Sequence, residues 1–230
     1  MLAHSPKLIA AKPLLPASIL RDMRFGGPEL VGLIVALSFA AGLNVYATVA
    51  TLGLLARAGV LDLPTGLHLL TSWWVIAASG ALFAVEFFAD KIPAFDLVWN
   101  ALHTFVRVPA AALMAYGAAA QLSPEKQLLA TLAGGAIALA AHSGKTAARA
   151  AVTPSPEPAS NIALSTGEDT LAIFLTWVAS SHPIVAGSVV VAFLVGIVVL
   201  IRFVVRAMKG LVRGAEGELS AERRKCLKAA

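Results

Sequence analysis

Charged residues are scarce in this sequence, and cysteine is almost absent. Only 13% of the 230 residues are charged, 58% are hydrophobic, and the mean hydropathy is +0.81. Soluble domains carry about 25% charged residues, so this chain cannot cover a water-facing surface. A single cysteine, Cys226, excludes an internal disulfide and a thiolate metal site. We therefore expect an integral membrane protein.

The net charge of +5 comes mainly from basic residues that flank the hydrophobic segments. Eight of the 18 lysine and arginine residues lie from Arg202 onward, and four precede the first apolar segment: Lys7, Lys12, Arg21 and Arg24. This distribution is typical of the positive-inside rule, and we expect no nucleic-acid partner. The basic tail is instead suited to contact with anionic lipid headgroups.

Six hydrophobic segments are predicted to cross the membrane, since about 20 apolar residues span its hydrocarbon core. The clearest is the uncharged segment 30–56. The others are 67–89, a helix that starts at Pro93 and includes 108–124, the segment 127–151, and the two halves of 170–201 divided at Pro183. Five spans would place the basic tail outside, whereas six place both termini in the cytoplasm.

The sequence thus predicts an all-α, polytopic bundle of about six transmembrane helices with both termini cytoplasmic. Residues 1–28 are predicted to be a disordered cytoplasmic leader, 29–205 the transmembrane domain and 206–230 a basic cytoplasmic tail. Lys12, Pro13 and Pro16 interrupt the N-terminal apolar stretch, so no cleavable signal peptide is expected. Translation could start at Met1 or Met23.

Ionisable residues gather between the second and third predicted spans, in "EFFADKIPAFDLVWNALHTFVR" (residues 86–107). Glu86 and Asp90 are four residues apart and share a helix face. Spacings of four, three and four then place a second group on one face: Asp96, Asn100, His103 and Arg107. A further base, Lys91, lies at this corner. We interpret the group as candidates for ligand binding or proton relay, because intramembrane ionisable groups are usually functional.

The later helices carry matching charges near the same membrane side. His142, Lys145 and Arg149 repeat the helical spacing in the fourth span. Glu168 and Asp169 are predicted to open the fifth helix, with "STGED" as its N-terminal cap, and the proline-rich "TPSPEPASN" before it is predicted not to be helical.

An unpaired charge at the bilayer centre costs about 2.5–3.5 kcal/mol on insertion scales, so these groups should pair. We expect Glu86 or Asp90 to pair with Arg107. We expect Lys145 or Arg149 to pair with Glu168 or Asp169. Asn44, midway along the first span, is interpreted as a hydrogen bond between helices.

The stretch "ADKIPAFDLVWNALHTFVRVP", followed by "SPEPASN" and "GED", resembles a family of bacterial multi-pass membrane proteins, domain of unknown function 4126. The resemblance runs from roughly residue 42 to residue 196. It covers, among others, Asp90, Lys91, Ile92, Pro93, Asp96, Trp99, His103, Thr104, Arg107, Ser155, Pro156, Glu157, Pro158, Asn161, Glu168 and Asp169. It implies a multi-pass protein of the bacterial inner (plasma) membrane and supplies no established activity.

Other motifs are weaker. "HSGKTA" (142–147) ends like a phosphate-binding loop, but Leu139 stands where the first glycine would be. The five histidines include no His-Glu-x-x-His pattern, so no metal site and no cofactor are predicted.

Three functions stay open. The first is a transporter or channel-like protein for a small solute, an ion or a proton-coupled substrate. The second is a membrane-embedded enzyme that acts on lipid headgroups, although no nucleophile or metal spacing supports it and we do not expect an enzyme. The third is a structural or assembly protein whose ion pairs fix helix packing. The expected partners are the lipid bilayer, a small solute or ion, and a second copy of the chain.

Overall fold

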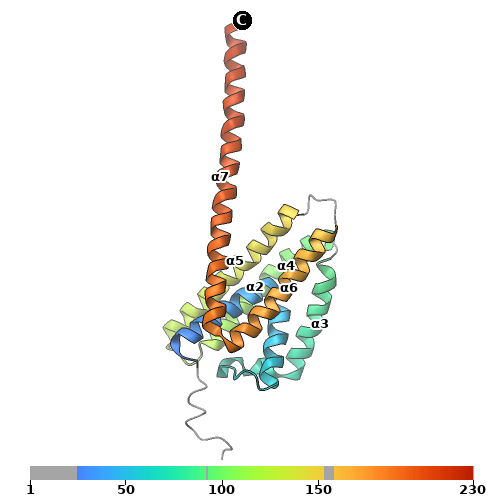
Figure 1. The fold of residues 1–230 in the computed structure, drawn as a ribbon, viewed down its shortest axis with the longest axis vertical. Helices are drawn as coiled ribbons and strands as arrows, with labels where there is room; N and C mark the ends of the chain where they lie inside the picture. The colour runs from blue at the N-terminus through green and yellow to red at the C-terminus, as the bar shows by residue number, and fades with distance from the viewer. Residues whose placement is uncertain (1–24, 92, 153–157, 230) are drawn as a thin grey trace, which may run out of the picture.

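A computed structural model describes residues 25–91, 93–152 and 158–229, and over these residues the chain is all-α (Figure 1). This confirms the predicted fold class. The elements are α2 (Gly27–Arg57), the 3₁₀ helix η1 (Thr65–Thr71), α3 (Trp73–Ala89), α4 (Pro93–Ala118), α5 (Pro124–Val152), α6 (Pro158–Ser181) and α7 (Pro183–Ala229).

Proline begins four of these helices: Pro93, Pro124, Pro158 and Pro183. Proline suits the first helical position because its missing N–H has no partner there in any case, and its φ is already helical. The predicted start at Pro93 and the predicted division at Pro183 are therefore confirmed. Each proline marks where one helix of the bundle turns into the next.

The described helices have membrane character. Three are long and apolar enough to cross a bilayer: Gly27–Arg57, Ile162–Ser181 and Pro183–Phe203. The pair η1 and α3, bent by 67°, would make a fourth if it forms one span. This is fewer than the six spans predicted from the sequence. α4 and α5 fall outside the set, and both carry polar and charged side chains along one face.

Apolar side chains on the outer surface agree with a lipid environment. Trp74 is 86% exposed, Phe105 81% and Leu69 74%, whereas Glu86 of α3 and Lys145 and Arg149 of α5 are buried. Water-soluble proteins rarely expose such side chains in quantity. At the start of α3, the guanidinium group of Arg57 lies over the ring of Trp73, 4.4 Å from its centroid.

Helix α2 is broken in its middle. Asn44 has φ −150° and ψ 103°, which is an extended conformation inside an otherwise helical segment. A Cβ on Gly32, in the first half, would lie 2.3 Å from the carbonyl oxygen of Pro183, where α7 begins. A Cβ on Gly53, in the second half, would lie 2.4 Å from the carbonyl oxygen of Leu70, just before α3. Both ends of α2 thus pack where other helices start.

Figure 1 shows the consequence, since α2 runs into the bundle, bends, and returns towards the end it came from. The sequence predicted a span over residues 30–56, and α2 is long and apolar enough for one, but the break at Asn44 was not predicted. An apolar composition shows that a segment is buried in lipid or protein, but it does not show that the segment is straight.

The two ends of the described chain lie apart. α7 begins beside Gly32 and extends away from the bundle to Ala229 (Figure 1). The first turn of α2 and the basic end of α7 therefore lie at opposite ends of the molecule. That both termini are cytoplasmic stays a prediction, and residues 1–24 of the predicted leader lie outside the described residues.

α2 forms the centre of the bundle and packs against α3, α4, α5, α6 and α7. Most of its apolar residues are buried, among them Leu33, Leu37 and Leu52, whereas Val31 and Leu54 are exposed. A helix that is apolar all round is typical of a bundle core. Because α3 to α7 all pack against α2, the break at Asn44 lies at the centre of the bundle.

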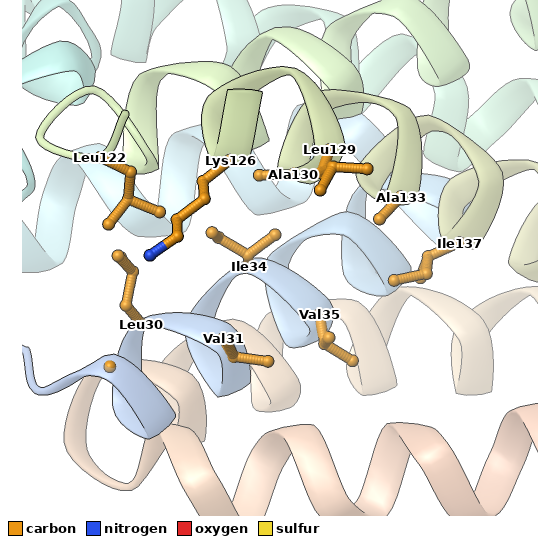
Figure 2. Close-up of a pocket in the computed structure, with 11 residues that line it drawn as sticks. Leu30, Val31, Ile34, Val35, Leu122, Lys126, Leu129, Ala130, Ala133 and Ile137 are labelled. Atoms are coloured by element: carbon orange, nitrogen blue, oxygen red, sulfur yellow. The ribbon is translucent and has the colours of Figure 1, made fainter. Parts of the chain in front are cut away.

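An apolar groove of about 520 Å³ lies between the first half of α2 and the start of α5 (Figure 2). Leu30, Ile34, Leu129 and Ile137 line it, and Lys126 is the one charged residue among the eleven that do so. A lining of this kind suits an acyl chain. None of the buried charged residues described below lies in it.

The close approach of α2 and α7 predicts the effect of Gly32→Ala. The added methyl group would meet the backbone of Pro183, so the two helices must separate, and we expect a loss of about 1–3 kcal/mol of stability. The measurement is thermal unfolding in detergent, followed by helical circular dichroism.

Gly196→Ala is the matched control, because nothing lies within 4 Å of the Cβ that it adds to α7. We expect it to leave stability unchanged or raise it by up to about 1 kcal/mol. An unfolding temperature for Gly32→Ala at or above that of Gly196→Ala would contradict the observed packing.

Candidate functional site

Seven ionisable side chains from four helices meet inside the bundle, and we call them the charge cluster: Glu86, Asp90, Arg107, Lys145, Arg149, Glu168 and Asp169. The most exposed of them, Glu168, is 8% accessible, and Glu86, Asp90 and Arg107 are 0% accessible. Charged groups sealed in this way are costly unless they are paired. Their burial makes the cluster the candidate site.

Helical spacing brings these groups together. Glu86 lies in the last turn of α3, and Asp90 directly follows that helix, four residues later on the same face. His142, Lys145 and Arg149 are all buried and share one face of α5, as their spacing predicted. His103 and Arg107 are likewise both buried on α4.

The ion pairs form one connected set. Glu86 pairs with Arg107. Lys145 Nζ lies 3.1 Å from Asp90 Oδ2, 3.3 Å from Glu168 Oε2 and 3.9 Å from Glu86 Oε1. Arg149 Nη2 lies 2.8 Å from both Asp90 Oδ2 and Glu168 Oε2. The predicted pairs of Arg107 with Glu86, and of Glu168 with the bases of α5, are confirmed.

Asp90 differs from expectation, because it turns towards α5 and bridges Lys145 and Arg149. Lys91 does not join the cluster. Its Nζ donates to the carbonyl oxygen of Phe87 at 2.9 Å and lies 3.2 Å from the Phe87 ring centroid. Asp96 and Asn100 belong to the predicted stripe on α4, but their side chains lie outside the described residues.

Two histidines extend the network along α4 and α5. Arg107 Nη1 lies 2.9 Å from His142 Nδ1, and His142 Nε2 lies 2.7 Å from Thr104 Oγ1. A guanidinium group can only donate, so Nδ1 accepts and His142 is a neutral imidazole that donates from Nε2 to Thr104. His103 Nε2 instead lies 3.1 Å from the hydroxyl of Tyr46 on α2. The two histidines thus have separate partners.

The described residues contain no group of three or more histidine, cysteine or carboxylate side chains placed to hold a metal ion. The carboxylates and bases of the cluster are groups that can bind protons or a small polar ligand.

The break in α2 opens directly onto the cluster. Asn44 Nδ2 donates to Asp169 Oδ1 at 2.8 Å, and Asn44 Oδ1 accepts from the backbone N–H of Ala47 at 2.9 Å. Lys145 Nζ donates to the carbonyl oxygen of Leu43 at 3.3 Å. In an unbroken helix Ala47 would donate to Leu43, whereas here Asn44 supplies the partner of Ala47 and Lys145 of the cluster supplies the partner of Leu43.

The charged groups beside the break also have the signs that the dipoles of the two half-helices of α2 favour. A cation, Lys145, meets the last carbonyl of the first half, and a carboxylate, Asp169, lies beside the first residue of the second half. This is the arrangement that helix dipoles favour. The predicted role of Asn44 as a hydrogen bond between helices is confirmed, but its second role, as the N-cap of a new half-helix, was missed.

Glu168 and Asp169 are not at a helix start, and this prediction was wrong. α6 begins at Pro158, so both acids lie almost three turns inside it, and Ser165 is buried within the helix. The error came from reading "TPSPEPASN" as wholly non-helical. Its last proline occupies the first position of a helix, where proline is favoured.

Each of the four carboxylates has one oxygen that is buried and has no hydrogen-bond partner among the described residues: Glu86 Oε2, Asp90 Oδ1, Glu168 Oε1 and Asp169 Oδ2. Buried polar atoms in native proteins are nearly always bonded. After the pairing within the cluster, each of the four acids therefore still has one carboxylate oxygen that can accept a hydrogen bond.

Apolar helices around a broken central helix, with charged groups enclosed inside, are the features of a membrane protein rather than of a soluble domain. The family model described as Domain of unknown function (DUF4126) matches residues 31–203, and the chain belongs to this family. No curated protein and no solved structure matches the chain. The match confirms the resemblance found at residues 42–196 and extends it in both directions.

The pair of Glu86 and Arg107 gives a test of how the cluster is held. Arg107→Met leaves Glu86 buried with only the more distant Lys145, at 3.9 Å, and we expect a loss of about 3–5 kcal/mol. In the double variant Glu86→Met, Arg107→Met both charges are gone, so we expect part of the lost stability to return. Thermal unfolding of the single and double variants in detergent measures the difference. A double variant less stable than both single ones would show that the pair does not carry this energy.

Proposed function

We propose that this protein is an inner-membrane transporter or channel-like protein that moves an ion or a proton-coupled small solute through the charge cluster. One observation carries the proposal: the break in α2 lies among the buried charges, with Asn44 bonded to Asp169 and Leu43 bonded to Lys145. Discontinuous helices whose half-helix ends face a polar site are a recurring design of membrane transporters.

The energetic argument points the same way. Ionisable groups in a membrane bundle are expensive, and they mark ion or substrate pathways more often than packing. An unbroken α2 would satisfy Leu43 and Ala47 within its own helix and would need neither Asn44 nor Lys145. The break exposes backbone groups to the cluster, which is useful for binding a ligand and has no evident use in packing alone.

The basic end of α7 supports an orientation. Figure 1 shows α7 extending past the end of the bundle at which α3 and α5 end and α6 begins, which is the end nearer the cluster. The lysines and arginines from Arg202 onward are carried on this extension. By the positive-inside rule this end faces the cytoplasm, so the cluster lies on the cytoplasmic side.

A packing role is the second candidate, and it is favoured by the mutual pairing of Glu86, Asp90 and Glu168 with the three bases. A cluster that only fixes helix packing should tolerate an unbroken α2. A transport site that uses the ends of the two half-helices should lose its activity when α2 is unbroken.

The experiment therefore changes the break rather than a charge. Full-length protein is reconstituted into liposomes, a pH gradient is applied, and proton flux is followed with an enclosed pH-sensitive dye. We expect flux in the wild type and at least a tenfold lower rate in Asn44→Leu, because leucine favours an unbroken helix and cannot bond to Asp169. Helical circular dichroism confirms that the variant is folded.

Ser38→Ala is the matched control on the same helix. Ser38 is buried, and its hydroxyl has no hydrogen-bond partner among the described residues, so its loss should leave flux unchanged. Equal flux in the wild type and in Asn44→Leu would favour the packing role and overturn the proposal.

A further inference from the structure

The charge cluster contains one more acid than base. Its three cations are Arg107, Lys145 and Arg149, and each forms ion pairs. Among the described residues, the acids within 4 Å of these cations are Glu86, Asp90 and Glu168. His142 accepts a hydrogen bond from Arg107 and so adds no charge. Three acids balance three bases, and Asp169 is the acid left over.

Asp169 has a different environment from the other three acids. It is 3% exposed, and among the described residues no lysine or arginine nitrogen lies within ion-pair distance of its carboxylate. Its Oδ1 accepts one hydrogen bond, from the neutral amide of Asn44 at 2.8 Å. Its Oδ2 is buried and has no partner in the described part of the chain.

The charged groups that face Asp169 lie farther away, on two helices. Lys145 comes from α5, and Asp90, Glu86 and Lys91 come from the end of α3. Lys145 is already bonded to Asp90 and to the Leu43 carbonyl oxygen, and Glu86 and Asp90 repel a further negative charge. α2 contributes only the neutral Asn44 at this point.

An ionised carboxylate that is buried with one neutral hydrogen bond is strongly disfavoured, and such a group takes up a proton instead. A bound proton also removes the surplus negative charge of the cluster. A metal ion fits less well, because the described residues hold no set of three suitable ligands.

We propose that Asp169 is the proton-binding site of this protein and that Asn44 transmits its protonation state to the break in α2. The coupling part of this proposal deepens the transport function proposed above and rests on it. The protonation of Asp169 itself does not depend on transport.

The contacts of Asn44 and Lys145 provide the physical link. When Asp169 is protonated, the cluster is neutral and Lys145 can remain bonded to the carbonyl oxygen of Leu43. When Asp169 loses its proton, the new negative charge attracts Lys145 and strengthens the hydrogen bond from Asn44. Because Asn44 also caps the second half of α2 through Ala47, the two protonation states favour different positions of that half-helix.

Infrared spectroscopy of the full-length protein in lipid nanodiscs tests the first part. A protonated carboxyl group absorbs in a region separate from carboxylates and amides. At neutral pH we expect the wild type to show this band, and Asp169→Asn, which keeps the shape and removes the acid, to lose it. Ser165→Ala is the control, since Ser165 is buried one turn away on the same face of α6 and carries no charge. The band should persist in it.

Labelling supplies a second measurement that needs no variant. Wild-type protein grown with carbon-13 aspartate should show a shifted band, whereas protein labelled only at glutamate should not. Absence of the band in the wild type, its persistence in Asp169→Asn, or a shift with labelled glutamate would each overturn the assignment to Asp169.

Hydrogen exchange tests the link to α2. After correction for the intrinsic effect of pH, exchange at Ala47 and the following turn of α2 should change severalfold between low and high pH in the wild type and stay constant in Asp169→Asn. The same exchange pattern in both proteins would contradict the link. A wild type that shows the band but no proton flux would contradict the proposed transport alone, whereas flux without the band would contradict the Asp169 assignment alone.

Discussion

The side chain of Lys145 joins the break in α2 to the acids of two other helices. Its Nζ lies 3.3 Å from the carbonyl oxygen of Leu43, 3.1 Å from Asp90 Oδ2 and 3.3 Å from Glu168 Oε2. A buried ammonium group with three acceptors is well satisfied, because it has three N–H donors. Without it, the Leu43 carbonyl would be left without a partner in the core, and Asp90 and Glu168 would face each other with only Arg149 between them. The broken conformation of α2 and the pairing of α3 with α6 therefore depend on the same cation.

The geometry of α2 places this cation inside the apolar layer. At 1.5 Å per residue, the half-helix before the break is about 25 Å long and the one after it about 20 Å. A hydrocarbon core is about 30 Å thick, so neither half would cross it alone. The outer ends of the two halves lie where α7 and α3 begin, and the junction at Asn44 is fully buried and bonded to α5 through Lys145 and to α6 through Asp169. Backbone that is not helical is tolerated at such depth only where protein groups satisfy it, and Asn44 and Lys145 do this.

Much of this could be predicted from local sequence, and the parts that could not are long-range. The spacing of His142, Lys145 and Arg149 fixes their common face because an α-helix has a constant period. Pro93 and Pro183 mark helix starts for a reason confined to one residue. The break at Asn44 is different, because its extended backbone is stabilised by Asp169, 125 residues later, and by Lys145, which binds the adjacent Leu43 from 102 residues away. Glycine and asparagine at positions 42 and 44 weaken a helix, but they do not determine that it breaks. The ion-pair partners of Asp90 could not be predicted for the same reason, because its pairing with α5 rather than with Arg107 depends on how the helices pack.

The paired acids and the unpaired acid of the cluster bear differently on a packing role. Three acids paired with three bases could fix the relative positions of four helices, and a set of this kind would need no ligand. Replacing buried ion pairs by apolar residues is often neutral or stabilising, so such pairs are weak evidence for a structural purpose. The fourth acid is the discriminating feature. Among the described residues, Asp169 has no lysine or arginine nitrogen within ion-pair distance, accepts one hydrogen bond from Asn44, and leaves one buried oxygen without a partner. A residue that serves packing would be neutral or paired at this place. A residue that gains and loses a proton must be ionisable, and for the proposed coupling it must touch the part of the protein that responds.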